Sequence, residues 1–162
     1  YSRIVDIQNA SARFVLTSAN GGIAGLEIKR TTGGTPEDVV VFSGSGAQRN
    51  TLINSRVDGG ATGYFQAKDV IEALGGAGGN FSQANRVSKS VVTNAPDKGI
   101  KAAGAGTYLI VEDSHIHHNF DGGVQATLEG NVEANRNIIE YSGYNAAGTE
   151  VRDNANGLSI QG

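Results

Sequence analysis

The stretch Ile110-Val111-Glu112-Asp113-Ser114-His115-Ile116-His117-His118-Asn119, followed closely by Gly122-Gly123-Val124, contains the pattern that decides the fold. Within it, Val111, Ser114 and Ile116 occupy positions n, n+3 and n+5 of a triplet that recurs along the chain. The copies are Val87/Ser90/Val92 and Ala134/Asn137/Ile139, at steps of 24 and 23 residues, then Leu52/Ser55/Val57, Ile23/Leu26/Ile28 and a degenerate Ile4/Ile7. Such a step indicates a solenoid, because each coil needs the same inward-facing residues.

A second apolar position follows each triplet and marks another strand of the coil. These positions are Phe14/Leu16, Val41, Ile100, Val124 and Leu158. Gly99 to Gly123 and Asp97 to Asp121 keep the 24-residue step. We therefore predict an all-β fold, a single-stranded parallel β-helix of about six coils that forms a single domain over residues 1–162. Right-handed winding is expected from the handedness of crossovers between parallel strands.

Polar residues fill the n+3 position in four successive coils: Ser55, Ser90, Ser114 and Asn137. At an inward-pointing bend, such side chains hydrogen-bond one another and the backbone of the next coil. The three serines are not predicted to be nucleophiles, because no glycine-flanked elbow surrounds them.

The 110–119 stretch and its Gly122-Gly123-Val124 continuation resemble the parallel β-helix repeat of the pectate-lyase-like superfamily. The resemblance covers roughly residues 20–162 and implies architecture, with polysaccharide chemistry only as an analogy. The combinations that mark polygalacturonases among these proteins are absent, namely Asn-Thr-Asp, Asp-Asp, Gly-His-Gly and Arg-Ile-Lys. This absence argues against that activity.

Composition narrows the classes of partner. The chain has 24 Gly and 2 Pro, so the glycines are expected in turns, and its net charge of −3 with mixed signs predicts no nucleic-acid or membrane partner. It contains no Cys, which excludes disulfides and thiol catalysis. It also contains no Met, so we expect a processed chain or a segment of a longer one. The location that fits is extracellular or cell-surface, with the periplasm as an alternative.

Asp97 and Asp121 are expected to lie one strand spacing apart, about 4.8 Å, on neighbouring coils. Stacked carboxylates repel unless a cation lies between them or one is protonated. One hypothesis is therefore a Ca²⁺ site with Asp97 and Asp121 as metal ligands. Another is a catalytic pair for glycoside cleavage or β-elimination, with Lys101 neutralising a substrate carboxylate. A third interpretation is that Asp simply suits the turn before glycine.

Two insertions interrupt the repeat. Residues 67–74, followed by Gly75-Gly76, have apolar positions on one helical face and predict a short helix. Residues 140–157 combine aromatic and polar side chains, as a carbohydrate site requires, and the predicted substrate-binding residues are Tyr141, Tyr144, Arg152 and Asn154. Separately, His115 and His117 share one outward strand face and allow either metal chelation or simple solvation.

Three functions stay open from the sequence. The first is a β-helix segment of a secreted or surface bacterial protein that recognises a polysaccharide or oligosaccharide. The second is a polysaccharide lyase, glycoside hydrolase or epimerase acting in a groove along the helix, and enzyme status is left open. The third is a structural or adhesin shaft. Because neither end has an evident cap, end-to-end self-association is expected.

Overall fold

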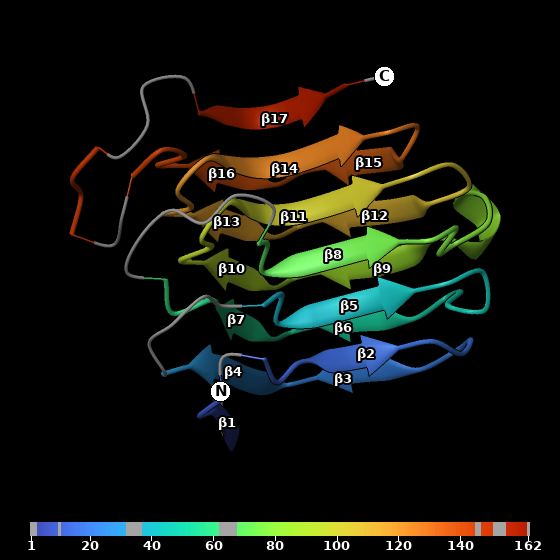
Figure 1. The fold of residues 1–162 in the computed structure, drawn as a ribbon, viewed down its shortest axis with the longest axis horizontal. Helices are drawn as coiled ribbons and strands as arrows, with labels where there is room; N and C mark the ends of the chain where they lie inside the picture. The colour runs from blue at the N-terminus through green and yellow to red at the C-terminus, as the bar shows by residue number, and fades with distance from the viewer. Residues whose placement is uncertain are drawn as a thin grey trace.

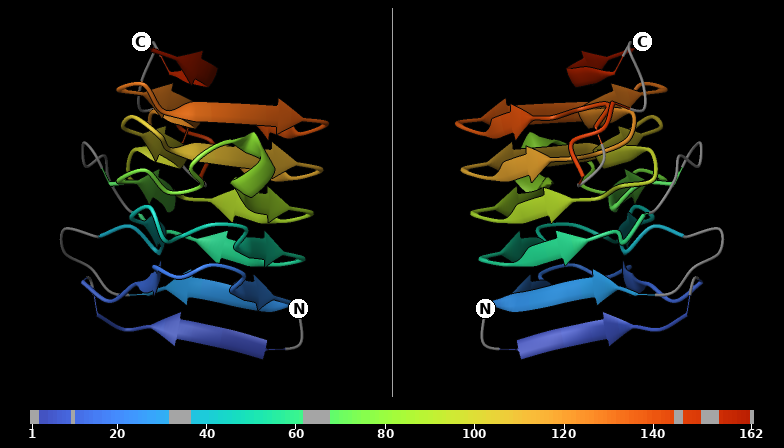
Figure 2. Two further views of the ribbon diagram at one scale, coloured as in Figure 1. Left: turned by 90° about the vertical axis from the view of Figure 1, so that its right-hand side faces the viewer. Right: turned by 90° about the vertical axis from the view of Figure 1, so that its left-hand side faces the viewer.

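The computed structural model describes residues 3–9, 11–31, 37–61, 68–144, 147–150 and 155–161, and it confirms an all-β parallel solenoid. The chain runs through three parallel sheets, here A, B and C, in the same order on every turn (Figure 1). Five such passes and the first two strands of a sixth give about five turns, stacked as layers between the two ends (Figure 2). Among the described residues no helix has the length and apolarity to cross a membrane.

The strands are short, as a three-sided coil requires. Sheet A contains β1 (Arg3–Ile7), β4 (Leu26–Arg30), β7 (Arg56–Asp58), β10 (Val91–Thr93), β13 (His115–His117) and β16 (Ile138–Glu140). Sheet B contains β2 (Phe14–Leu16), β5 (Val40–Ser43), β8 (Ile71–Leu74), β11 (Lys98–Ala103), β14 (Gly122–Thr127) and β17 (Asn156–Ile160). Sheet C contains β3 (Gly22–Ala24), β6 (Thr51–Ile53), β9 (Asn85–Ser88), β12 (Tyr108–Glu112) and β15 (Asn131–Asn135).

The predicted triplet is confirmed as two of the inward rows of the core. Its first position forms a row in sheet C, and its last position forms a row in sheet A: Leu52, Val87, Val111 and Ala134, and Val57, Val92, Ile116 and Ile139. Most of these side chains are fully buried. Burying one Val, Leu or Ile contributes about 1.5–3 kcal/mol, so the repeated rows account for much of the hydrophobic stabilisation.

Two of the predicted positions are wrong. The degenerate copy Ile4/Ile7 does not continue the triplet, because Val5 pairs with Ile28 and faces inward, whereas Ile4 pairs with Glu27 and is exposed. In sheet B, Val40 rather than Val41 lies in the inward row with Phe14. Such a shift exchanges the two faces of a strand, and where both residues are apolar the sequence gives no alternation to fix it.

The predicted helix over 67–74 is wrong in its described part. Ile71–Leu74 forms β8, in which Ile71 pairs with both Val40 and Ile100. Gly75 and Gly76 end the strand with positive φ rather than capping a helix. The connection from β8 to β9 is also long and contains the 3₁₀ helix η1 (Phe81–Gln83), so insertions occur at two corners of the coil.

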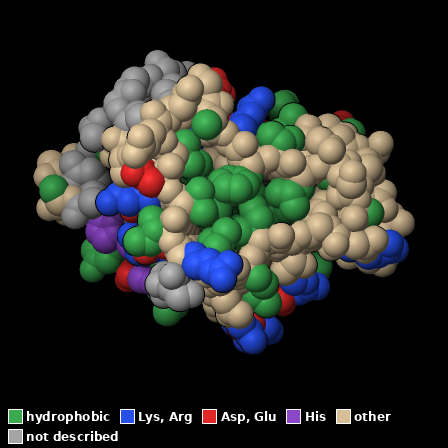
Figure 3. Space-filling view, turned by 90° about the horizontal axis from the view of Figure 1, so that it is seen from below, with side chains coloured by type: hydrophobic (Ala, Val, Ile, Leu, Met, Phe, Trp, Pro, Cys, Tyr) green, Lys and Arg blue, Asp and Glu red, His purple; other side chains and the backbone are tan. Residues whose placement is uncertain are grey.

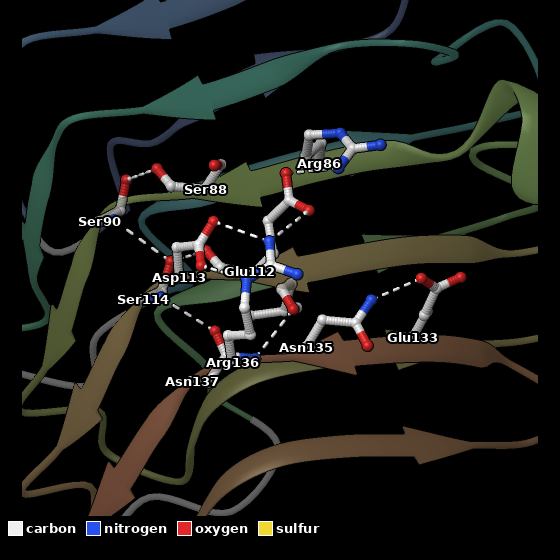
Figure 4. Close-up of polar contacts among 11 residues, drawn as sticks. Arg86, Ser88, Ser90, Glu112, Asp113, Ser114, Glu133, Asn135, Arg136 and Asn137 are labelled. Atoms are coloured by element: carbon white, nitrogen blue, oxygen red, sulfur yellow. Dashed lines mark hydrogen bonds and ion pairs between the residues drawn. The ribbon is translucent and has the colours of Figure 1, made fainter.

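The predicted polar ladder is confirmed at the corner between sheets C and A (Figure 4). The Ser90 amide donates to the Ser114 hydroxyl (3.2 Å), and the Ser114 amide donates to the Asn137 Oδ1 (3.0 Å). The Ser55 amide likewise donates to the Ser90 hydroxyl (3.3 Å). Each hydroxyl also donates to a carbonyl two residues earlier. The ladder thus satisfies backbone groups at a corner where sheet hydrogen bonds stop.

The residue before each n+3 position of the triplet, from Leu26 to Asn137, adopts a left-handed backbone. Gly25, Asn54, Lys89, Asp113 and Arg136 all have φ between 49° and 68°. Gly25, Asn54 and Asp113 are of the residue types that adopt this conformation most readily, whereas for residues such as Lys89 and Arg136 it costs about 1–2 kcal/mol. At Lys89 and Arg136 the corner geometry, rather than residue preference, therefore sets the conformation.

Gly99 and Gly123 are not turn residues, contrary to the expectation from composition. Both lie inside strands of sheet B. A Cβ on Gly99 would lie 2.8 Å from a methyl group of Ile116, and one on Gly123 would collide with a methyl group of Ile139. Glycine is therefore needed at both positions because isoleucine side chains of sheet A pack closely against the backbone there.

Candidate functional site

The predicted Asp97 and Asp121 lie on neighbouring coils, and Lys98 connects them. The Lys98 Nζ is 2.8 Å from Asp97 Oδ1 and also contacts Asp121 Oδ2. Burial disfavours the charged amine, but hydrogen bonds from Lys98 to Asp121 and Asp97 hold its pKa above the ordinary value. The positive charge that stacked carboxylates need is thus supplied by the chain itself.

Lys101, the third predicted catalytic residue, is paired with two other carboxylates. Its Nζ lies 3.2 Å from Asp69 Oδ2 and 3.3 Å from Glu72 Oε1. Burial raises the pKa of Asp69 to about 7, despite the nearby charge of Lys101. Burial, followed by the negative charge of Asp38, also raises the pKa of Glu72.

The row Asp38, Asp69 and Lys98 also connects the backbones of three coils. The Asp69 amide donates to Asp38 Oδ1 (2.8 Å), and the Lys98 amide donates to Asp69 Oδ1 (3.0 Å). We name Asp38, Asp69, Asp97, Lys98 and Asp121 the charged ladder. Its inter-coil bonds resemble those of the serine ladder, so its first role is structural.

Three observations bear on catalysis and metal binding at the charged ladder. A carboxyl that titrates near pH 7 is a candidate general acid or base, but the side chain of Asp69 has no exposure to solvent. The hollow beside Lys98 and Asp121 has a volume of about 180 Å³, below the range typical of ligand pockets. Within the described ranges, no group of three or more His, Cys, Asp or Glu residues is arranged to hold a metal ion.

A second cluster lies where sheet A turns toward sheet B. The rings of His118 and Tyr141 are stacked, with centroids 4.7 Å apart and an interplanar angle of 16°. This stacking follows from the winding. Asn94, His118 and Tyr141 each follow a sheet A strand on successive turns, and all have φ between 51° and 55°.

Two more imidazoles extend this row on the outer face of sheet A. The centroid of His117 lies 4.3 Å from that of His115 and 4.8 Å from that of His118. His117 Nδ1 is 2.6 Å from His118 Nδ1, and His115 Nε2 is 2.7 Å from Glu140 Oε1. Burial lowers the pKa of His117 to about 4, and the neighbouring imidazoles and Arg56 act in the same direction. His117 is therefore neutral at pH 7.

Tyr144 completes what we name the aromatic corner: His115, His117, His118, Tyr141 and Tyr144. Its ring meets Tyr141 edge-on, with centroids 6.4 Å apart, and its amide donates to the Tyr141 carbonyl. The structure thus brings together two of the four predicted substrate-binding residues. Arg152 and Asn154 lie outside the described residues.

Sequence reasoning did not connect His118 or Glu140 with the predicted carbohydrate site, and it missed Asp38, Asp69, Glu72 and Lys98 around the charged ladder. One signal could have found His118, since Asn94, His118 and Tyr141 are separated by 24 and 23 residues, the steps of the triplet itself. No repeat spacing in the sequence indicates the contacts of Lys98, because these contacts depend on the direction of one long side chain.

Comparisons with known proteins identify no relative of this chain. No family model, no curated protein and no solved structure matches the chain.

Proposed function

We propose that this β-solenoid recognises carbohydrate at the aromatic corner. The observation that carries the proposal is the Tyr141 ring, which is 52 % exposed and held flat against His118. The apolar face of a sugar ring packs on such an aromatic surface, and a ring already held by stacking loses little freedom on binding.

Polar groups for sugar hydroxyls lie beside the ring. Glu140 precedes Tyr141 directly, and its carboxylate is held by His115. Glu140 can accept hydrogen bonds from hydroxyls. Nδ1 of the neutral His117 contacts His118, and its Nε2 is the ring nitrogen that can meet a hydroxyl without the desolvation cost of a charge. The ligand class is therefore a polysaccharide or oligosaccharide. We also propose that the protein is secreted or displayed on the cell surface, and that it belongs to the pectate-lyase-like superfamily.

Retention on an oligosaccharide array tests the proposal. Tyr141→Ala should weaken retention at least tenfold, and Tyr141→Phe, which keeps the flat ring, should retain most of it. Phe81→Ala is the matched control, because Phe81 is an exposed aromatic residue on a different corner. Thermal melting should show all three variants folded. Equal retention by the wild type and Tyr141→Ala, or no retained glycan at all, would contradict the proposal.

A further inference from the structure

Two ring nitrogens of the same kind converge on the outer side of sheet A. His117 Nδ1 lies 2.6 Å from His118 Nδ1, and Thr93 Oγ1 lies 3.3 Å from the same His117 atom. A neutral imidazole carries one N–H and one lone pair, and only one proton fits between two Nδ1 atoms in contact. At least one of the two nitrogens therefore presents its lone pair toward the other.

The convergence depends on the backbone of His118. Successive side chains of a β-strand point to opposite faces, so adjacent histidines in a continuous strand would lie on opposite sides of the sheet. His117 instead ends β13, and His118 follows it with a φ of 53°, in the left-handed region. With this backbone the two rings lie together, with centroids 4.8 Å apart. The corner of the solenoid thus creates a pair that a strand alone would not.

Neighbouring rings hold the two imidazoles in place. Tyr141 stacks on His118, and His115 lies against His117 with centroids 4.3 Å apart. His115 is itself held by Glu140 through its Nε2. Donor atoms that are already ordered lose little conformational freedom when an ion binds.

We propose that His117 and His118 chelate a divalent transition-metal ion through their two Nδ1 atoms. Bonds from zinc to imidazole nitrogen are about 2.0–2.1 Å long, so two such ligands at right angles or in tetrahedral positions are about 2.8–3.4 Å apart. The 2.6 Å spacing therefore needs to widen by only about 0.2–0.8 Å. Thr93 Oγ1 can then hydrogen-bond a water molecule that completes the coordination.

The donor atoms decide the class of ion. Imidazole suits Zn²⁺, Cu²⁺ and Ni²⁺, whereas Ca²⁺ and Mg²⁺ prefer oxygen ligands. Among the first three, the general order of affinity places Cu²⁺ first. In the part of the chain that the structure describes, no third His, Cys, Asp or Glu joins the pair. Water therefore fills the other positions, and the affinity is lower than that of a closed four-ligand site.

Charge and exposure allow a cation to reach the pair. The positive charge of Arg56 is balanced by Glu27 and Asp58, at 3.6 Å and 3.5 Å. Glu140 lies beside His117 on the next strand of sheet A. Both imidazoles are only partly buried, and Figure 3 shows histidine side chains that reach the surface at one side of the solenoid, among charged side chains.

The chelating pair differs from the one that the sequence pattern indicates, which is His115 with His117. Since His115 Nε2 is bound to Glu140, His115 serves as the control histidine. The metal site also uses other atoms than the carbohydrate site, because a sugar hydroxyl would meet His117 at Nε2 and the ion at Nδ1. The inference therefore does not depend on carbohydrate binding.

Calorimetric titration of the metal-free, tag-free chain with CuCl₂ tests the proposal. The wild type should bind one equivalent, and the EPR spectrum of the loaded protein should show splitting from two imidazole nitrogens. His118→Asn and His117→Thr should each weaken Cu²⁺ binding about tenfold or more, and the control His115→Val should bind like the wild type. Each substitution introduces the residue found at the same position one coil earlier, namely Asn94, Thr93 and Val91.

Zn²⁺ gives a second readout. Because binding to the folded state raises stability, Zn²⁺ should raise the melting temperature of the wild type and of His115→Val, but not that of His118→Asn. Ca²⁺ should shift none of them. Melting curves without metal should show that the variants fold, and if one does not, the number of nitrogens in the EPR spectrum of the wild type still decides.

Three results would overturn the proposal. The first is the absence of saturable Cu²⁺ binding by the wild type. The second is an EPR spectrum with a single nitrogen ligand, or equal affinities of the wild type and His118→Asn. The third is a loss of affinity in His115→Val as large as that in His118→Asn, because the ion would then be bound by His115.

Discussion

The Lys98 ammonium contacts the carboxylates of both Asp97 and Asp121, which belong to neighbouring coils. The side chains of all three are nearly buried. In a solenoid any residue type that repeats at one position is stacked on itself, so repeated aspartates create repulsion at each step. A lysine reaching between the coils converts that repulsion into a bridge.

Replacing Lys98 by methionine should be strongly destabilising. The change keeps the apolar stem but leaves two partly buried carboxylates without their cation, and breaking a buried pair in this way costs about 3–5 kcal/mol. Urea denaturation at pH 7 should show this loss. Lys89→Met, on an exposed corner lysine, is the control and should change stability by less than about 0.5 kcal/mol.

A calcium site at Asp97 and Asp121 would make the melting temperature depend on a chelator. If a metal ion stabilised this pair, a chelator would lower the melting temperature of the wild type and added Ca²⁺ would restore it. With Lys98 supplying the charge, we expect the same melting temperature with and without chelator.

Replacing Ser114 by alanine should weaken the serine ladder at one step. The buried Ser90 amide would lose its acceptor, at a cost of about 1–3 kcal/mol. Ser114→Asn should recover much of this loss, because Asn137 already performs the same role one coil further on. The control is Ser82→Ala, whose hydroxyl makes only an exposed bond to Asn80. Equal unfolding free energies for Ser114→Ala and Ser82→Ala would contradict the role of the ladder.

The inward rows could be predicted from the sequence because a solenoid repeats the same burial requirement on each turn. The strand β8 could not, since Val70, Ile71 and Leu74 fit the spacing of a helical face as well as a short strand. The aromatic corner was half predicted. Tyr141 and Tyr144 are conspicuous in composition, whereas the role of His118 follows from stacking between coils and needs the register.

Lys89 offers a test of the left-handed backbone conformation at the corner between sheets C and A. Its φ is 49° and its side chain is exposed, so backbone preference dominates the effect of a substitution. Lys89→Val should destabilise the fold by about 1–2 kcal/mol, since a β-branched residue is strained there, and Lys89→Gly should equal or exceed wild-type stability. Lys29→Val on β4 is the control, because a strand accepts valine. If the valine variant of Lys89 were as stable as its glycine variant, the corner would not impose this conformation.

His117 should make the fold less stable in mild acid. Its pKa is about 4 in the folded protein, below the ordinary value of 6.5, because of burial, His115, His118 and Arg56, with Glu140 opposing them. Between pH 6.5 and 4 the unfolded chain therefore binds a proton that the folded protein does not, and stability falls as the pH falls through this window. Asp69 acts with the opposite sign, because its pKa is raised to about 7 and the folded protein binds the extra proton. Comparing unfolding free energies at pH 7 and pH 5, His117→Asn should lose less stability on acidification than the wild type, and Asp69→Asn should lose more. Parallel profiles for the wild type and His117→Asn, or an NMR titration of the His117 ring with a midpoint near 6.5, would show that this imidazole is solvated like a free histidine and that the aromatic corner is looser than the stacked rings indicate.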